Sequence, residues 1–170
     1  MKMSGSETIS APREAVWAGL NDPAVLKQCI PGCDTIIKDS PTSMTAKASI
    51  KLGPLKVAFT GLVTLSELNP PESYRISGQG QGGLAGFASG GAYVRLKAIS
   101  STETQLDYDV DAQVGGKLAM LGSRLIDSTA QSLASQFFVK FSNAVKLKSA
   151  KAEKVVSKKM TVKKAIKKKK

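Results

Sequence analysis

Residues 106–145, LDYDVDAQVGGKLAMLGSRLIDSTAQSLASQFFVKFSNAV, decide the fold because the spacing of their apolar side chains changes in the middle of the stretch. From Leu106 to Val114 apolar and polar residues alternate, which is typical of a strand in a sheet with one wet face. After Gly116 the apolar residues recur three to five positions apart as far as Val145, which indicates one amphipathic helix of about 28 residues. The helical stripe comprises Leu118, Leu121, Leu125, Ala130, Leu133, Phe137, Phe141 and Val145.

The chain before this stretch predicts further strands and two short helices. Residues 2–10 form a first strand, and the alternating segments 44–52, 57–65, 74–81 and 87–100 form later ones. Between them lie a helix from Arg13 to Leu20 and a second helix that Asp22 caps and Pro23 begins. The predicted order is one strand, two short helices, six strands, of which five are located above, and one long helix. This order predicts an α+β fold: a curved antiparallel sheet of about seven strands with the long helix across its concave face.

Positive charge is concentrated at the end of the chain. Residues 146–170 hold twelve lysines and one acidic residue, whereas residues 1–145 hold thirteen basic and twelve acidic residues. We therefore predict a domain over residues 1–147 and a lysine-rich tail over residues 148–170 that takes the protein to a negatively charged surface.

Three roles for the tail are consistent with this charge: binding an anionic membrane surface, binding nucleic acid, and a solubilising extension that binds nothing. Anionic lipid is favoured, at about 1 kcal/mol per lysine near the surface. Nucleic acid is disfavoured because the tail has neither arginine nor aromatic residues. The predicted membrane-binding residues are Lys158, Lys159, Lys163, Lys164, Lys167, Lys168, Lys169 and Lys170.

The composition argues against catalysis and against a metal site. The chain has no histidine, and its two cysteines, Cys29 and Cys33, do not have the spacing of a redox or zinc motif. No nucleophile–base pair is visible, and the Gly78-x-Gly80-x-x-Gly83 pattern is not followed by the helix that a dinucleotide site needs. No apolar run has the length of a signal or a membrane span. We expect a cytoplasmic protein that is not an enzyme and holds no metal.

Small residues at inward positions of the middle strands predict open space beneath the long helix. Such a space suits a hydrophobic small molecule, although the glycines are equally consistent with bulges that bend the sheet. The predicted cavity residues, with Tyr74 and Tyr108 as polar groups, are Phe59, Val63, Tyr74, Ile76, Gly78, Gly80, Ala88, Gly90, Tyr108, Val110, Leu121, Leu125 and Phe137.

The order of elements resembles the helix-grip fold of the SRPBCC superfamily, which includes polyketide cyclases, START lipid-transfer domains and the birch-pollen allergen. Several segments resemble a narrower family, the CoxG proteins of carbon monoxide dehydrogenase. These segments are 11–17 (APREAVW), 20–23 (LNDP), 29–33 (CIPGC), 83–88 (GLAGFA), 108–118 (YDVDAQVGGKL) and 122–127 (GSRLID).

The resemblance covers residues 1 to about 145 and leaves out the lysine-rich tail. It implies a non-catalytic accessory protein of a molybdenum-containing carbon monoxide dehydrogenase or a related hydroxylase. It also implies a quinone, menaquinone or ubiquinone, in the cavity and attachment to the inner face of the cytoplasmic membrane. A maturation or membrane-docking factor without a carried ligand, and a general lipid-binding protein, remain alternatives.

Overall fold

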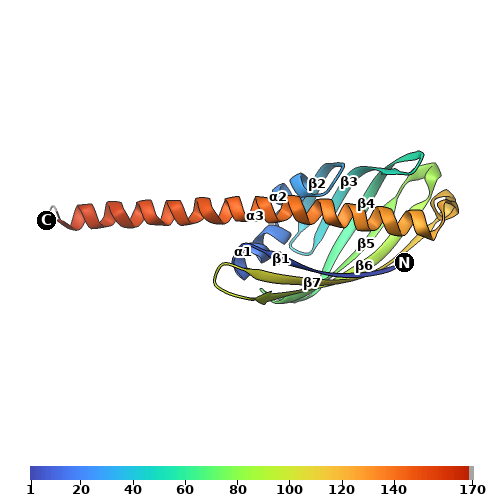
Figure 1. Ribbon diagram of the computed structural model, residues 1–170. Coiled ribbons are helices and arrows are strands. Elements are labelled where there is room, and N and C mark those ends of the chain that lie inside the picture. Colours follow the sequence, from blue (N-terminus) through green and yellow to red (C-terminus); the bar gives the residue numbers. More distant parts are fainter. Residues whose placement is uncertain (169–170) are drawn as a thin grey trace.

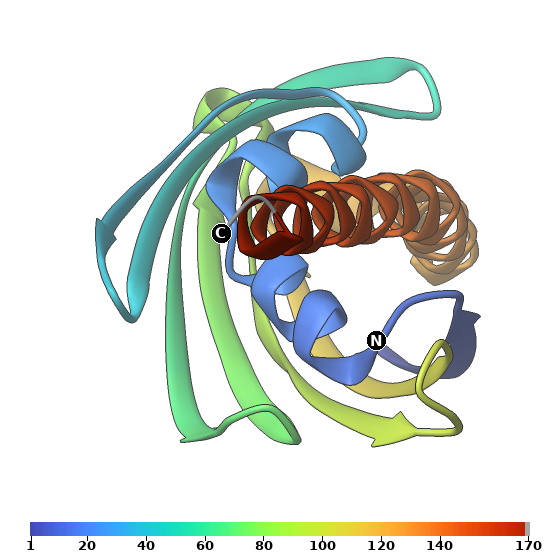
Figure 2. The same ribbon diagram turned by 90° about the vertical axis from the view of Figure 1, so that its left-hand side faces the viewer.

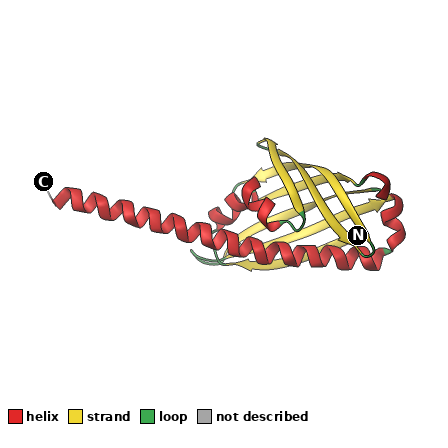
Figure 3. Cartoon of the chain, turned by 90° about the horizontal axis from the view of Figure 1, so that it is seen from above, coloured by secondary structure: helices red, strands yellow, loops and turns green. Residues whose placement is uncertain are grey.

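The computed structural model describes the backbone of residues 1–168 and the side chains of residues 1–151. One antiparallel sheet of seven strands, in the order β1-β7-β6-β5-β4-β3-β2, curves around a long helix. Figure 2 shows α3 end-on in the hollow of the sheet, and Figure 3 shows it running along that hollow. This arrangement confirms the predicted fold class. The strands are β1 (Lys2–Ile9), β2 (Cys33–Ser40), β3 (Ser43–Leu52), β4 (Leu55–Asn69), β5 (Ser73–Gln81), β6 (Phe87–Ala98) and β7 (Thr104–Gly115). The α-helices are α1 (Arg13–Leu20), α2 (Pro23–Cys29) and α3 (Ser123–Lys168). Two short 3-10 helices are η1 (Gly83–Ala85) and η2 (Gly116–Leu121).

Helices α1 and α2 close one end of the sheet and pack on the middle of α3. The Asp22 carboxylate accepts a hydrogen bond from the Ala24 backbone N–H at 2.9 Å, so the predicted cap of α2 is present. Gly19 lies so close to Phe141 and Val145 of α3 that a Cβ there would crowd both side chains. Phe141 and Val145 are fully buried, and the main hydrophobic core gathers around this junction.

Helix α3 differs from the predicted helix at both ends. It begins at Ser123, so Leu118 and Leu121 belong to η2 and not to the long helix. The two helices are separated by Gly122, whose φ of +90° breaks the α-helical path. At the other end the backbone stays helical to Lys168 and projects beyond the body as an arm (Figure 1).

The predicted domain boundary between residues 147 and 148 falls inside this continuous helix and stays a prediction. The side chains of Lys158, Lys159, Lys163, Lys164, Lys167 and Lys168 lie outside the described part, and Lys169 and Lys170 lie outside it altogether. Their predicted role in membrane binding is therefore also still a prediction.

Candidate ligand cavity

A cavity of about 410 Å³ lies between α3 and the concave face of the sheet. Such a volume falls in the range of small-molecule sites. The sheet, the end of α1, α2, the residues after α2 and the first half of α3 all contribute walls. The lining residues are Met3, Leu20, Leu26, Ile30, Pro31, Ile36, Met44, Ile50, Val63, Leu65, Tyr74, Ile76, Ala92, Val94, Leu106, Tyr108, Val110, Leu133, Ala134, Phe137 and Phe138.

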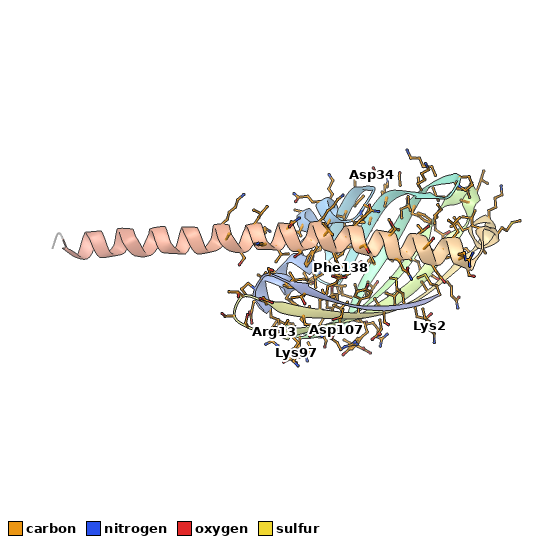
Figure 4. The ribbon with its side chains drawn as sticks, in the orientation of Figure 1. Lys2, Arg13, Asp34, Lys97, Asp107 and Phe138 are labelled. Atoms are coloured by element: carbon orange, nitrogen blue, oxygen red, sulfur yellow. The ribbon has the colours of Figure 1, made fainter. Side chains whose placement is uncertain are left out.

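The only hydrogen-bonding side chains in this lining are Tyr74 and Tyr108. Burial raises the pKa of both phenols, so both hydroxyls are neutral donors at physiological pH. Trp17 packs edge-on against the ring of Tyr74, with ring centroids 5.2 Å apart. Phe138, which is labelled in Figure 4, extends from α3. Its ring stacks on the ring of Tyr108. Aromatic packing thus holds each hydroxyl-bearing ring in the cavity wall.

A second apolar cavity, of about 290 Å³, lies at the end of the body remote from the arm. It shares Ile50 and Leu133 with the main cavity, so the two spaces adjoin. The residues that line it are Met1, Ile50, Leu52, Phe59, Gly80, Ala88, Ala112, Val114, Leu118, Ile126, Thr129, Ala130 and Leu133.

A polar cleft between α3 and β3 also touches the main cavity, through Pro31, Ile50 and Leu133. It has a volume of about 380 Å³. Its other lining residues are Gly32, Ser49, Lys51, Ser128, Thr129, Ser132 and Gln136. The apolar interior therefore borders hydroxyl and amide groups along one side of α3.

The structure places the predicted cavity residues in three groups. Val63, Tyr74, Ile76, Tyr108, Val110 and Phe137 line the main cavity, and Phe59, Gly80 and Ala88 line the second one. Gly78, Gly90, Leu121 and Leu125 line neither cavity.

For Gly90 and Leu125 the structure shows the reason, and nothing in it explains glycine at position 78. Gly90 is exposed, and a Cβ there would collide with the carbonyl oxygen of Asp111 on the paired strand β7. Leu125 packs against the turn at Gly53, and Leu121 belongs to η2. At Gly78 a Cβ would make only ordinary contacts, the nearest being 3.7 Å from the Leu62 carbonyl oxygen.

The alternative that the glycines are bulges is wrong for β5, β6 and β7. The pairing of β5 with β6 is continuous from Ser73 to Gln81, and the pairing of β6 with β7 is continuous over Phe87–Ala98 and Thr104–Gly115. Glycine at position 90 instead permits a close approach of two strands, while glycine at position 80 leaves space in the second cavity.

The family model for CoxG, described as a subunit of carbon monoxide dehydrogenase, matches residues 5–146. The chain belongs to the CoxG family. The match includes every strand except the start of β1 and ends within α3, so the cavities lie inside the family region. A comparison with curated protein sequences gave no match.

Solved structures support the assignment of this CoxG-family protein to the helix-grip fold. A conserved protein from Geobacillus kaustophilus is 30% identical, with a TM-score of 0.80 over 85% of this chain and 95% of that one. A START superfamily protein from Mycobacterium smegmatis is 12% identical, with a TM-score of 0.66 over 86% of this chain and 97% of that one. The Zhui aromatase/cyclase from Streptomyces sp. R1128 is 13% identical, with a TM-score of 0.63 over 86% and 93% of the two chains.

The fold is thus shared with an enzyme, and fold alone does not decide the activity. Membership of the CoxG family, together with the apolar cavity, indicates an accessory protein that binds a hydrophobic ligand.

Several residues of the CoxG-family cavity are not predictable from the sequence. Leu20, Leu26 and Ile30 reach the cavity from the two short helices and the turn after them. Seven or eight residues are too few for a helical period to show which face is buried. Met44 is a different case and was detectable, because it begins the clean alternation of β3 on the inward side.

Outside the cavities, the side chains of residues 1–151 form no group of three or more histidine, cysteine, aspartate or glutamate residues that could hold a metal. Cys29 is buried in the core, and burial raises the pKa of its thiol. On the outer face of β7, Asp109 pairs with Arg95 at 2.9 Å, and hydrogen bonds, first from Ser6 and then from Gln105, lower the pKa of Asp107. In the described part of the chain, no helix combines the length and apolar character needed to cross a membrane.

Proposed function

We propose that this CoxG-family protein carries a respiratory quinone, menaquinone or ubiquinone, for a molybdenum-containing carbon monoxide dehydrogenase. The observation that supports this most directly is the main cavity, whose 21 lining residues include no charged side chain and only two hydroxyl groups. An isoprenoid chain needs an apolar lining of this kind. A quinone head needs hydrogen-bond donors for its carbonyl oxygens, and Tyr74 and Tyr108 provide two neutral ones.

The carrier would work at the inner face of the cytoplasmic membrane. Its cavity shields the isoprenoid chain from water while the quinone head meets the dehydrogenase, so the electrons of carbon monoxide oxidation reach the respiratory chain. The lysine-rich tail would hold the protein to anionic lipid, and this part of the proposal rests on the charge of residues 146–170 alone.

The decisive experiment is extraction of the purified full chain with organic solvent, followed by mass spectrometry. The host should contain both menaquinone and ubiquinone. Stoichiometric quinone supports the proposal. An empty cavity favours a docking or maturation factor, and a cavity filled with phospholipid favours a general lipid-binding protein, and either result overturns the quinone carrier.

A matched pair of variants ties the bound molecule to the cavity. Ala92→Leu places a larger side chain in the main cavity, whereas Ala98→Leu places the same side chain at an exposed position of the same strand. We expect Ala92→Leu to lower the bound quinone severalfold and Ala98→Leu to leave it unchanged. Equal loading of the two variants would mean that the ligand lies elsewhere.

Membrane attachment through the tail is tested by changing the eight lysines between Lys158 and Lys170 to glutamine in the full chain. Glutamine keeps helix propensity but removes charge. Co-sedimentation with phosphatidylglycerol-containing vesicles should fall sharply, and binding to pure phosphatidylcholine vesicles should be weak for both proteins. Undiminished sedimentation of the glutamine variant would remove the tail as a tether.

A further inference from the structure

The most exposed large apolar side chains of the described structure lie at the end of the body remote from the arm. Leu84 of η1 is 92% exposed and Met120 of η2 is 85% exposed. The two short helices contact each other, and the backbone of Gly86 lies against that of Gly116. We call residues 82–87 and 115–122 the tip. Because apolar side chains gain nothing from such exposure in water, the tip has the character of a contact surface.

Basic residues surround the tip. Lys51 and Lys56 flank the turn between β3 and β4, Lys117 lies in η2, and Arg124 lies in the first turn of α3. Lys2 is at the same end of the body (Figure 4). All five are exposed, and none of them forms an ion pair with another residue among 1–151. Acidic residues near these five are Asp111, which lies opposite Lys2 in the pairing of β1 with β7, Asp127, which follows Arg124 in α3, and Asp34, whose carboxylate accepts a hydrogen bond from Ser49. Five basic residues against these three leave an excess of positive charge.

Apolar side chains surrounded by cations match the surface of an anionic bilayer. Leucine and methionine enter the interface between headgroups and acyl chains, and lysine and arginine contact the phosphates. A protein partner would have to supply an apolar pocket and an acidic rim together, whereas an anionic bilayer supplies both properties everywhere.

The tip also forms the floor of the second cavity. Leu118 of η2 is 1% exposed and lines that cavity, while Met120 of the same short helix points to solvent. Gly116 and Gly122, with φ of +71° and +90°, lie at the two ends of η2. Displacement of η2 as a unit would uncover the second cavity, which adjoins the main cavity at Ile50 and Leu133.

We propose that the tip is a lipid-binding surface, through which the cavity exchanges its hydrophobic ligand with an anionic membrane. Leu84 and Met120 enter the bilayer interface, the surrounding lysine and arginine side chains bind phosphate groups, and the ligand passes beneath η2. The identity of the ligand rests on the proposed function, but the membrane contact does not. This contact is separate from the tail, which begins at the opposite end of the body.

The test uses the full chain with both apolar residues replaced, Leu84→Ser together with Met120→Ser. Both side chains are exposed, so the fold and the unfolding temperature should not change. The control is Ile99→Ser, which removes a 51% exposed apolar side chain from the loop between β6 and β7, at the other end of the sheet. Binding to phosphatidylcholine vesicles with and without phosphatidylglycerol is measured in a protein whose eight tail lysines are glutamine, so that the tail does not mask the tip.

We expect the double variant to lose at least about tenfold in affinity for phosphatidylglycerol-containing vesicles, because burying one leucine or methionine side chain is worth more than a tenfold change in affinity. Transfer of menaquinone from donor to acceptor vesicles should slow by a similar factor, and Ile99→Ser should behave like its parent protein.

Unchanged binding and transfer in the double variant would overturn the proposal. The proposal would also be overturned if the double variant bound the dehydrogenase more weakly but bound vesicles as before, because the tip would then be a protein contact. If extraction shows no quinone but vesicle binding still depends on Leu84 and Met120, the quinone carrier fails and the lipid-binding tip stands.

Discussion

The ring of Phe138 on α3 stacks on the ring of Tyr108 on β7, with centroids 5.3 Å apart and planes inclined by 20°. Both residues line the main cavity. Phe138 also packs edge-on against Phe137, which in turn stacks on the buried Phe141. A row of aromatic rings therefore joins the cavity wall to the hydrophobic core and fixes the position of the helix over the sheet.

Replacing Phe138 by leucine should lower the free energy of unfolding by about 1 kcal/mol beyond the small change in burial, because the stacked pair is lost. Urea denaturation measures this change. The coupling is isolated by a cycle with Tyr108→Leu. If Phe138→Leu lowers the free energy of unfolding by the same amount in the Tyr108→Leu protein as in the parent, the two rings do not interact energetically.

Two glycines of neighbouring strands should respond differently to the same substitution. Gly90→Ala forces a Cβ against the Asp111 carbonyl oxygen, so we expect a loss of about 2 kcal/mol or more, measured by urea denaturation. Gly78→Ala meets nothing closer than 3.7 Å and should be close to neutral. Equal effects at both positions would contradict the close approach of β6 and β7.

Gly80→Leu should leave the fold intact and reduce ligand loading, because position 80 faces the second cavity and its Cβ would make only ordinary contact with Phe59. Thermal unfolding and extraction of the bound ligand measure the two properties. Unfolding of this variant at ambient temperature would show that the second cavity cannot accept a larger side chain.

Thr104 is the fully buried polar residue of the described core, and its hydroxyl donates a hydrogen bond to the Ala11 carbonyl oxygen at 2.7 Å. Thr104→Val keeps the shape but leaves that carbonyl without its partner, which should cost about 1–3 kcal/mol in chemical denaturation. Thr104→Ser keeps the hydroxyl and removes only a methyl group. Should the serine variant be the less stable of the two, packing and not the hydrogen bond would dominate at this position.

Lys148 donates a hydrogen bond to Asp22, and this contact is the first cause of the lowered pKa of the Asp22 carboxyl. A carboxyl with a lowered pKa in the folded state stabilises the fold above its unfolded pKa, and this contribution is lost as pH falls through the folded value. The pair is partly exposed, so Lys148→Met should cost only about 0.5 kcal/mol at neutral pH.

The difference in unfolding free energy between Lys148→Met and the parent should disappear in strongly acidic solution, where Asp22 is protonated in both states. A difference that persists there would mean that Lys148 acts through packing. Asp22→Asn is the companion variant, because asparagine keeps the cap of α2 and removes only the charge.

The fold was predictable because its signals are local and repeated. Alternation from Leu106 to Val114 places one face of β7 inward, and the neighbouring strands repeat the pattern. The number of strands is predictable but the position of β2 is not, since Cys33–Ser40 has little alternation and is mostly exposed at the edge of the sheet. The apolar stripe ends at Val145, yet no glycine or proline follows Gly122, so nothing in the sequence stops the helix there.

The site was predictable where it belongs to the sheet, and at Phe137 on the apolar stripe of the long helix. Every second side chain along a strand lies on the same face of the sheet and therefore in the same environment. This alternation identified the cavity residues Val63, Tyr74, Ile76, Tyr108 and Val110. The walls formed by α1 and α2, and the contribution of Phe138 from α3, depend on how helices pack on the sheet, which no single segment encodes. The same alternation wrongly predicted Gly90 as a cavity residue, because it gives no information on how closely a neighbouring backbone approaches.

A single straight helix connects the two ends of this molecule. Helix α3 starts beside the tip at Ser123 and ends at Lys168, a length of about 70 Å, more than twice the hydrocarbon thickness of a bilayer. Both ends can touch one flat membrane only when this rod lies along the surface. When the protein stands upright on its tip, the tail is held far above the lipid, within reach of an enzyme in solution. The angle between α3 and the membrane thus determines whether the lysines face lipid or a partner.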